Sequence, residues 1–182
     1  MIDHSILAKE NFLKGYNCSQ AVLLSFSDLT GLDETVAMKL ASSFGGGMGR
    51  MREVCGAVSG ALMVLGLLYG YDATASTADA DKKAHYARVQ AFCKRFREAQ
   101  SSIVCREILQ NHAKKLQETK KAAEEAQLAA MRANDASPTP RTAEYYASRP
   151  CADACALAAR LLDEYLQEEE VVSLLPKGDH IR

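Results

Sequence analysis

Apolar residues recur at intervals of three and four along most of the chain, which is the period of an amphipathic α-helix. Polar residues and glycines interrupt this pattern and divide it into segments. No stretch shows the regular apolar–polar alternation of a half-buried strand. The pattern therefore predicts an all-α protein, a single-domain multi-helix bundle that spans residues 1–182.

Capping residues and glycines set the expected helix bounds. Asn17 and Asp33 are good N-caps, and Pro150 suits the first turn of a helix. Gly15, Gly31 and the run 45–47 are expected to end helices. We predict helices over residues 3–14, 17–29, 33–44, 54–70, 79–99, from 102 onward, and 150–167. Two inward faces are expected to be Val36, Leu40 and Phe44 in one helix, and Tyr86, Val89, Phe92, Cys93 and Phe96 in another.

The segment from Val54 to Tyr71 carries no charge over 18 residues, which is the lower limit for a membrane-spanning helix. Four glycines dilute its hydrophobicity, and no comparable segment exists elsewhere. We therefore expect a buried central helix and no membrane insertion. Gly56 and Gly60 place a flat stripe on one of its faces, which allows either tight helix packing or the approach of a flat cofactor.

Residues 110–133 are rich in Lys, Glu, Gln and Ala, and they predict a charged helical arm followed by a loop over 134–150. Burying so many charges would be very costly, so most of the arm is expected to stay in water. As an extension of this prediction, the arm could form a homodimer interface along one edge, at Leu109, Leu116, Ala123 and Ala130.

The net charge of −1 offers no basic face for phosphate contacts, so no nucleic-acid partner is expected. The N-terminal segment lacks the features of a secretory signal, so we expect a cytoplasmic protein. In a reducing compartment, six cysteines indicate redox, metal-binding or core thiols rather than permanent disulfides.

Four cysteines share a predicted position at a helix start: Cys18, Cys55, Cys105 and Cys151. The positive end of the helix dipole favours an anion there, so such thiols are expected to be more acidic. We therefore predict that the four converge on one site. Arg50 and Arg52 could lower the pKa of Cys55, the candidate nucleophile, or hold an anionic group.

The remaining candidates carry weaker signals. Cys93, on the apolar face of its helix, is expected to be a core thiol. Cys155 lies one turn after Cys151 and could resolve a disulfide, act as a fifth ligand or pack in the core. The histidines fall in polar stretches and are expected to be solvated: His4, His85, His112 and His180.

Several strings resemble the C_GCAxxG_C_C family of redox-active proteins: GYNCSQAVLLSF, GGGMGRMREVCGAVSGALMVLGLLYG, SSIVCREIL and PCADACALAARLL. The resemblance implies that the family's four defining cysteines are Cys18, Cys55, Cys105 and Cys151. The chain departs from the family pattern in its longer charged segment between Cys105 and Cys151 and in the extra Cys93 and Cys155.

Three functions remain open from the sequence. The first is a thiol oxidoreductase with an unknown redox partner, in which one helix-start thiolate attacks and a second thiol resolves. The second is an iron–sulfur or other metal centre with the same four cysteines as ligands. The third is a helical scaffold in which the cysteines pack.

Overall fold

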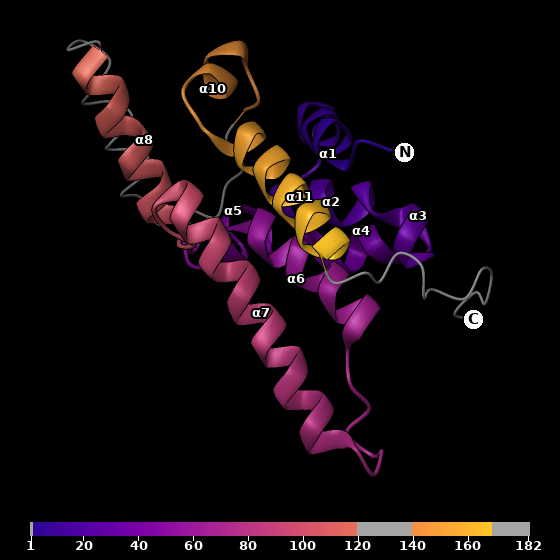
Figure 1. The fold of residues 1–182 in the computed structure, drawn as a ribbon. Coiled ribbons are helices and arrows are strands. Elements are labelled where there is room, and N and C mark those ends of the chain that lie inside the picture. Colours follow the sequence, from indigo (N-terminus) through magenta and orange to yellow (C-terminus); the bar gives the residue numbers. More distant parts are fainter. Residues whose placement is uncertain (1, 120–139, 169–182) are drawn as a thin grey trace.

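A computed structural model describes residues 2–119 and 140–168, and this part of the chain is all-α (Figure 1). One isolated antiparallel β-bridge joins Val54 to Val104. The helices are α1 (His4–Leu13), α2 (Cys18–Ser25), α3 (Ser27–Thr30), α4 (Glu34–Ser42), α5 (Gly45–Met48), α6 (Gly56–Tyr69), α7 (Ala78–Gln100), α8 (Cys105–Thr119), α10 (Ala143–Ala147) and α11 (Cys151–Glu168).

Local side-chain caps start several of these helices. Asn17 caps α2: its side chain accepts hydrogen bonds from the amides of Ser19 and Gln20, and Gln20 accepts from the Asn17 amide in return. Asp33 caps α4 by accepting from the Val36 amide at 2.9 Å. Both caps are those that the sequence predicts, because capping depends on residues three positions apart at most.

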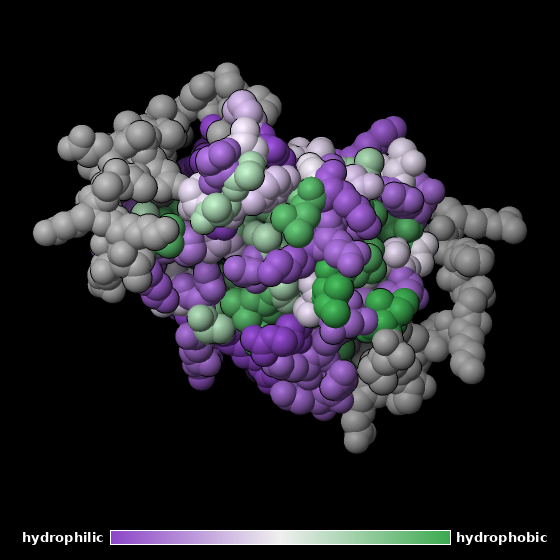
Figure 2. Space-filling model, turned by 90° about the horizontal axis from the view of Figure 1, so that it is seen from above, coloured by the Kyte–Doolittle hydropathy of each residue, from purple (hydrophilic) through white to green (hydrophobic). Residues whose placement is uncertain are grey.

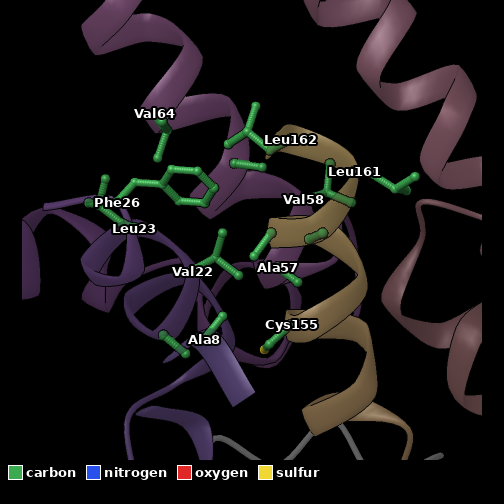
Figure 3. Close-up of a cluster of buried hydrophobic side chains, with 14 of the residues drawn as sticks. Ala8, Val22, Leu23, Phe26, Ala57, Val58, Val64, Cys155, Leu161 and Leu162 are labelled. Atoms are coloured by element: carbon green, nitrogen blue, oxygen red, sulfur yellow. The ribbon is translucent and has the colours of Figure 1, made fainter. Parts of the chain in front are cut away.

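The core forms where α2, α6 and α11 meet, with α1 packed across α2 and α11. Val22, Leu23 and Phe26 point from α2 and its C-cap toward Val58 and Val64 of α6 and Leu162 of α11, and all of these side chains are buried (Figure 3). The first six residues of α6 are also buried, whereas most of its second half is half-buried. The predicted central helix is therefore buried mainly in its first half.

The long helix α7 packs against α6 and α11 through its second half, where Phe92 and Phe96 are fully buried. Its first half extends away from the body (Figure 1). Tyr86 lies in that half and is 49% exposed, so its predicted inward position is wrong.

The predicted inward face of α4 is also wrong. Val36 and Leu40 are half exposed, whereas Ala37 and Ala41 are buried against the core. Because α4 packs closely against α2, the small alanines fit between the two helices. The sequence pattern favoured Val36 and Leu40 because they are more hydrophobic.

The predicted charged arm begins as the outer part of α8. Lys114 and Lys115 are exposed there. Residues 120–133, and with them most of the arm, lie outside the described part of the chain. Within the predicted loop 134–150, the described residues contain the short helix α10, which Thr142 caps by accepting from the Tyr145 amide.

In the described residues, no helix is long and apolar enough to cross a membrane. Seen from above, hydrophilic side chains cover most of the surface, and hydrophobic ones lie between them in small separate groups (Figure 2).

Candidate thiol site

The β-bridge places two of the predicted cysteines beside each other. The Cys55 amide donates to the Ile103 carbonyl at 2.8 Å, and the Cys105 amide donates to the Glu53 carbonyl at 2.6 Å. Cys55 is the N-cap of α6, and Cys105 is the first residue of α8. The bridge therefore aligns two helix starts that are 50 residues apart in the sequence.

The other two cysteines also stand at helix starts. Cys18 is the first residue of α2, and Cys151 is the first residue of α11, directly after the buried Pro150. All four line one cavity of about 60 Å³. The predicted convergence of the four cysteines is therefore confirmed.

The glycine-rich link between α4 and α6 allows this convergence. Gly47 has a φ of +74°, and a β-carbon there would lie 2.7 Å from Cβ of Cys105. Likewise, a β-carbon on Gly56 would lie 3.0 Å from Cβ of Cys18. The chain then continues through Arg50 and Arg52, whose φ values of 72° and 64° are unfavourable for residues with a β-carbon. Left-handed backbone of this kind is often concentrated at functional sites.

Gly60 serves helix packing. A β-carbon on it would lie 2.6 Å from the Ser19 carbonyl oxygen and 3.0 Å from Cβ of Val22, so its open face is occupied by α2. The predicted stripe of Gly56 and Gly60 is thus explained by the close approach of α2 and α6. Of the three predicted cofactor-binding residues, Gly56 lines the cavity, whereas Gly60 and Arg50 lie outside its lining.

Three of the thiols interact with one another. Cys18 and Cys151 share a side-chain hydrogen bond, and so do Cys18 and Cys155. The Cys155 thiol, which is fully buried, also donates to the Cys18 carbonyl at 3.7 Å. Cys155 extends from α11 into the core (Figure 3). The structure thus joins the start of α2 to the first two turns of α11 through sulfur atoms.

The prediction that the four helix-start thiols have lowered pKa values is wrong when all four are reduced. Burial and the neighbouring Cys105 raise the pKa of Cys55 to about 12, although the amides of Ala57 and Val58 lower it. Burial likewise raises the pKa of Cys105 and of Cys93. The helix start does favour the thiolate of Cys55, but desolvation in a cavity shared with other sulfurs outweighs it.

Within the hydrogen-bonded pair, the two thiols are not equivalent. The hydrogen bond from Cys151 lowers the pKa of Cys18, while the hydrogen bond with Cys155 and burial raise it by more. The same contact with Cys18, followed by burial, raises the pKa of Cys151. Cys151 is thus the donor and Cys18 the acceptor of this pair, so of these two thiols Cys18 ionises more readily. Cys18 in turn donates to Cys155, whose pKa this contact lowers while burial raises it.

Arg52 acts on a different thiol from the one predicted. It donates a hydrogen bond to the Cys105 thiol, and its charge favours the thiolate of both Cys105 and Cys151. Arg149 favours the same two thiolates. Because Arg52 is close to Cys55 in the sequence, Cys55 was the predicted partner of its charge. The left-handed turn at Arg52 and the β-bridge instead direct the guanidinium toward Cys105 at the start of α8.

A metal ion was the alternative prediction for Cys18, Cys55, Cys105 and Cys151. In the chain as far as it is described, no group of three or more His, Cys, Asp or Glu side chains is arranged to hold one. The four thiols as placed therefore do not fit a single metal ion.

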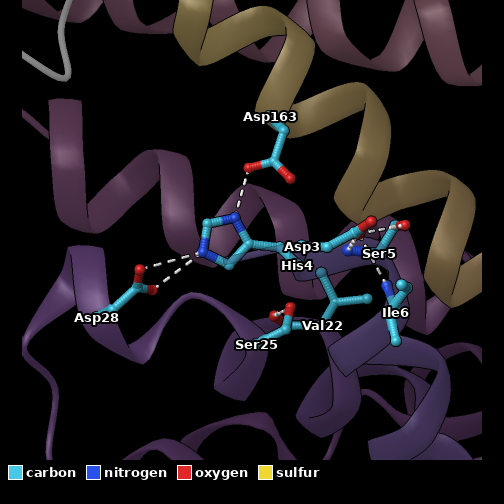
Figure 4. A network of polar contacts seen from close by, with 8 residues as sticks. All are labelled: Asp3, His4, Ser5, Ile6, Val22, Ser25, Asp28 and Asp163. Atoms are coloured by element: carbon cyan, nitrogen blue, oxygen red, sulfur yellow. Dashed lines mark hydrogen bonds and ion pairs between the residues drawn. The ribbon is translucent and has the colours of Figure 1, made fainter. Parts of the chain in front are cut away.

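The prediction that His4 is solvated is wrong. Its side chain is buried: Nδ1 lies 2.5 Å from Asp163 and Nε2 lies 3.1 Å from Asp28 (Figure 4). The ring also stacks on Phe26 at 4.2 Å. The network connects α1, α3 and α11. His180 lies outside the described residues.

These features define an all-helical protein with a cysteine-lined cavity at converging helix starts. The sequence matches a family described as "Putative redox-active protein (C_GCAxxG_C_C)" over residues 16–165, and the chain belongs to this C_GCAxxG_C_C family. Membership supports a general redox role. No curated protein and no solved structure matches the chain.

Proposed function

We propose that the protein is a thiol–disulfide redox protein in which Cys18 and Cys151 form the working pair. The observation that carries this proposal is that both thiols line the same cavity, where the interaction between them shifts their two pKa values in opposite directions. Thiol–disulfide exchange needs one thiolate to attack and a second thiol close enough to resolve the mixed disulfide. A pair of interacting thiols in one cavity meets both needs.

Cys18 attacks first. Its thiolate accepts the hydrogen bond from Cys151 and lies at the start of α2, and both favour the negative charge. The thiolate displaces one sulfur of a disulfide substrate, so a bond forms between Cys18 and the other sulfur and one substrate thiolate leaves. Cys18 is also half-buried rather than fully enclosed, which gives the substrate access.

Cys151 resolves the intermediate. Once Cys18 is bound in the mixed disulfide, it no longer carries the charge that raises the pKa of Cys151, whereas Arg149 and Arg52 still lower it. Cys151 then loses its proton and attacks the sulfur of Cys18. The second substrate thiolate leaves, and the protein retains a Cys18–Cys151 disulfide. Two protein thiols are oxidised and one substrate disulfide is reduced to two thiols.

The test is disulfide mapping by mass spectrometry after incubation in graded mixtures of 2-mercaptoethanol and its disulfide. We expect a Cys18–Cys151 linkage that forms at a defined ratio of the two reagents. Cys18→Ser and Cys151→Ser should abolish it, and the matched control Cys93→Ser should retain it, because Cys93 lies outside the cavity lining.

Two results would overturn the proposal. One is that Cys18 and Cys151 stay reduced, or pair with other partners, at every ratio. The other is that anaerobically purified protein carries stoichiometric iron with a visible absorption band that is lost in Cys18→Ser, because cysteines that ligate a cluster are not free for exchange.

A further inference from the structure

Charged side chains around the cavity have one sign. Of the described residues that line it, three are charged, and all are arginines: Arg52, Arg141 and Arg149. Arg141 is exposed, and the other two are half-buried. Since none of the described residues that line the cavity carries a carboxylate, the thiols face a surface of net positive charge.

None of these arginines is neutralised by a salt bridge to a carboxylate in the described part of the chain. Arg141 donates to the Phe12 carbonyl at 3.2 Å and lies over the Phe12 ring, and Arg149 lies over the Tyr145 ring. Stacking holds the guanidinium groups in place while their charge stays available. Four helix starts add the positive ends of their dipoles to the same cavity.

We propose that the cavity selects small disulfides that carry carboxylate groups, with Arg141 and Arg149 binding the carboxylates beside the thiols. This inference rests on the proposed function and names its substrate class. Guanidinium groups bind carboxylates through paired hydrogen bonds, and an aromatic platform restricts their orientation. The cavity of about 60 Å³ has room for the reacting end of such a molecule, so the carboxylates would lie toward Arg141, which is exposed.

The chemistry follows the two exchange steps already described. The Cys18 thiolate breaks the substrate disulfide and releases one carboxylate-bearing thiolate. Cys151 then displaces the second, and the protons of the two protein thiols end on the two released molecules. The arginines take no part in bond making: they bind the incoming anion and stabilise the leaving thiolate by charge.

Three disulfides of similar size but different charge test the inference. They are 3,3′-dithiodipropionate (anionic), 2-hydroxyethyl disulfide (neutral) and cystamine (cationic). The rate at which each oxidises the Cys18–Cys151 pair is divided by its rate with the urea-unfolded chain, which removes differences in intrinsic reactivity. We expect a normalised rate about tenfold higher for the anionic probe than for the neutral one, and lowest for the cationic probe.

The arginine variants separate binding from reactivity. The double variant Arg141→Gln/Arg149→Gln should reduce the anionic preference to about one, even where it also changes the rate with the neutral probe. The matched control Arg160→Gln should keep the preference, because Arg160 is paired with Glu164 on the surface of α11 and lies outside the cavity lining.

Equal normalised rates for the three probes would overturn this inference. A preference for the anionic probe that survives in the double variant would also overturn it. Either result would leave the proposed function intact. If the neutral probe also fails to oxidise the pair, the proposed function itself is wrong. The two failures are therefore distinguishable in one set of measurements.

Discussion

At the scale of single residues, the thiols illustrate a competition between a local and a non-local effect. Cys55 receives the help of two helix-start amides, yet its pKa rises to about 12 because it is buried beside Cys105. Sequence position alone predicts the first effect. The second depends on which sulfurs the fold brings together, so no reading of residues near Cys55 could predict it.

The raised pKa values predict a steep pH dependence of the redox reaction. Because Cys18 and Cys151 both have pKa values well above the ordinary value, only a small fraction is thiolate at neutral pH. The oxidation rate of the pair by 2-hydroxyethyl disulfide should rise about tenfold per pH unit from about pH 7 to about pH 9. Stopped alkylation followed by mass spectrometry measures this rate, and a plateau within that range would contradict the prediction.

His4 predicts a second pH effect, on stability. Burial lowers the pKa of His4, but the hydrogen bonds and charges of Asp163 and Asp28 outweigh this and raise it. A folded-state pKa above the unfolded one means that the stabilisation is fully present below the unfolded value and is lost as the pH rises through the folded value. The excess stability of the wild type over His4→Gln should therefore be larger at about pH 5.5 than at about pH 8.5.

Urea unfolding of both proteins at the two pH values measures this difference. His112→Gln serves as the control, because burial lowers the pKa of His112 and the sign of its pH effect is opposite. A stability difference between wild type and His4→Gln that grows toward alkaline pH would show that the network binds a neutral imidazole.

At the scale of the elements, local signals were sufficient where a few neighbouring residues decide the structure. The caps at Asn17 and Asp33 and the cysteines at four helix starts could be predicted for this reason. The β-bridge at Val54 and Val104 could not, because it joins segments 50 residues apart and leaves no alternating pattern. The inward face of α4 was mispredicted because close packing selected Ala37 over Val36.

The glycines of α6 give a matched test of close packing. Gly60→Ala should destabilise the protein by about 1–3 kcal/mol, because its β-carbon would lie 2.6 Å from the Ser19 carbonyl oxygen of the rigid helix α2. Gly66→Ala meets no atom within 4 Å in the same helix and should stabilise it by about 0.5–1 kcal/mol. Thermal or urea unfolding measures both. Equal effects of the two substitutions would contradict the packing at Gly60.

At the scale of the whole molecule, the site is assembled from segments spread across the chain. Cys18 and Cys151 stand near opposite ends of the family match over residues 16–165, and α1, which lies before it, contributes Phe12 to the cavity. The cavity exists only when α1, α2, α6, α8 and α11 are in place. The geometry of the proposed thiol pair therefore depends on folding.

This dependence predicts that oxidation stabilises the protein. A Cys18–Cys151 disulfide closes a loop of about 130 residues, which in the chain-entropy model raises the free energy of unfolding by up to about 5 kcal/mol. The two thiols already line the same cavity at the starts of α2 and α11. Urea unfolding of the reduced and oxidised protein should show a higher midpoint for the oxidised form.

By the same linkage, the folded chain should hold the disulfide more tightly than the unfolded chain does. When urea unfolds the protein, a more oxidising ratio of disulfide to thiol in the buffer should therefore be needed to keep the pair half oxidised. Cys93→Ser should keep both effects, and Cys151→Ser should abolish them. An oxidised protein that unfolds at a lower urea concentration than the reduced one would mean that the native fold opposes this disulfide, and that Cys18 and Cys151 are not the working pair.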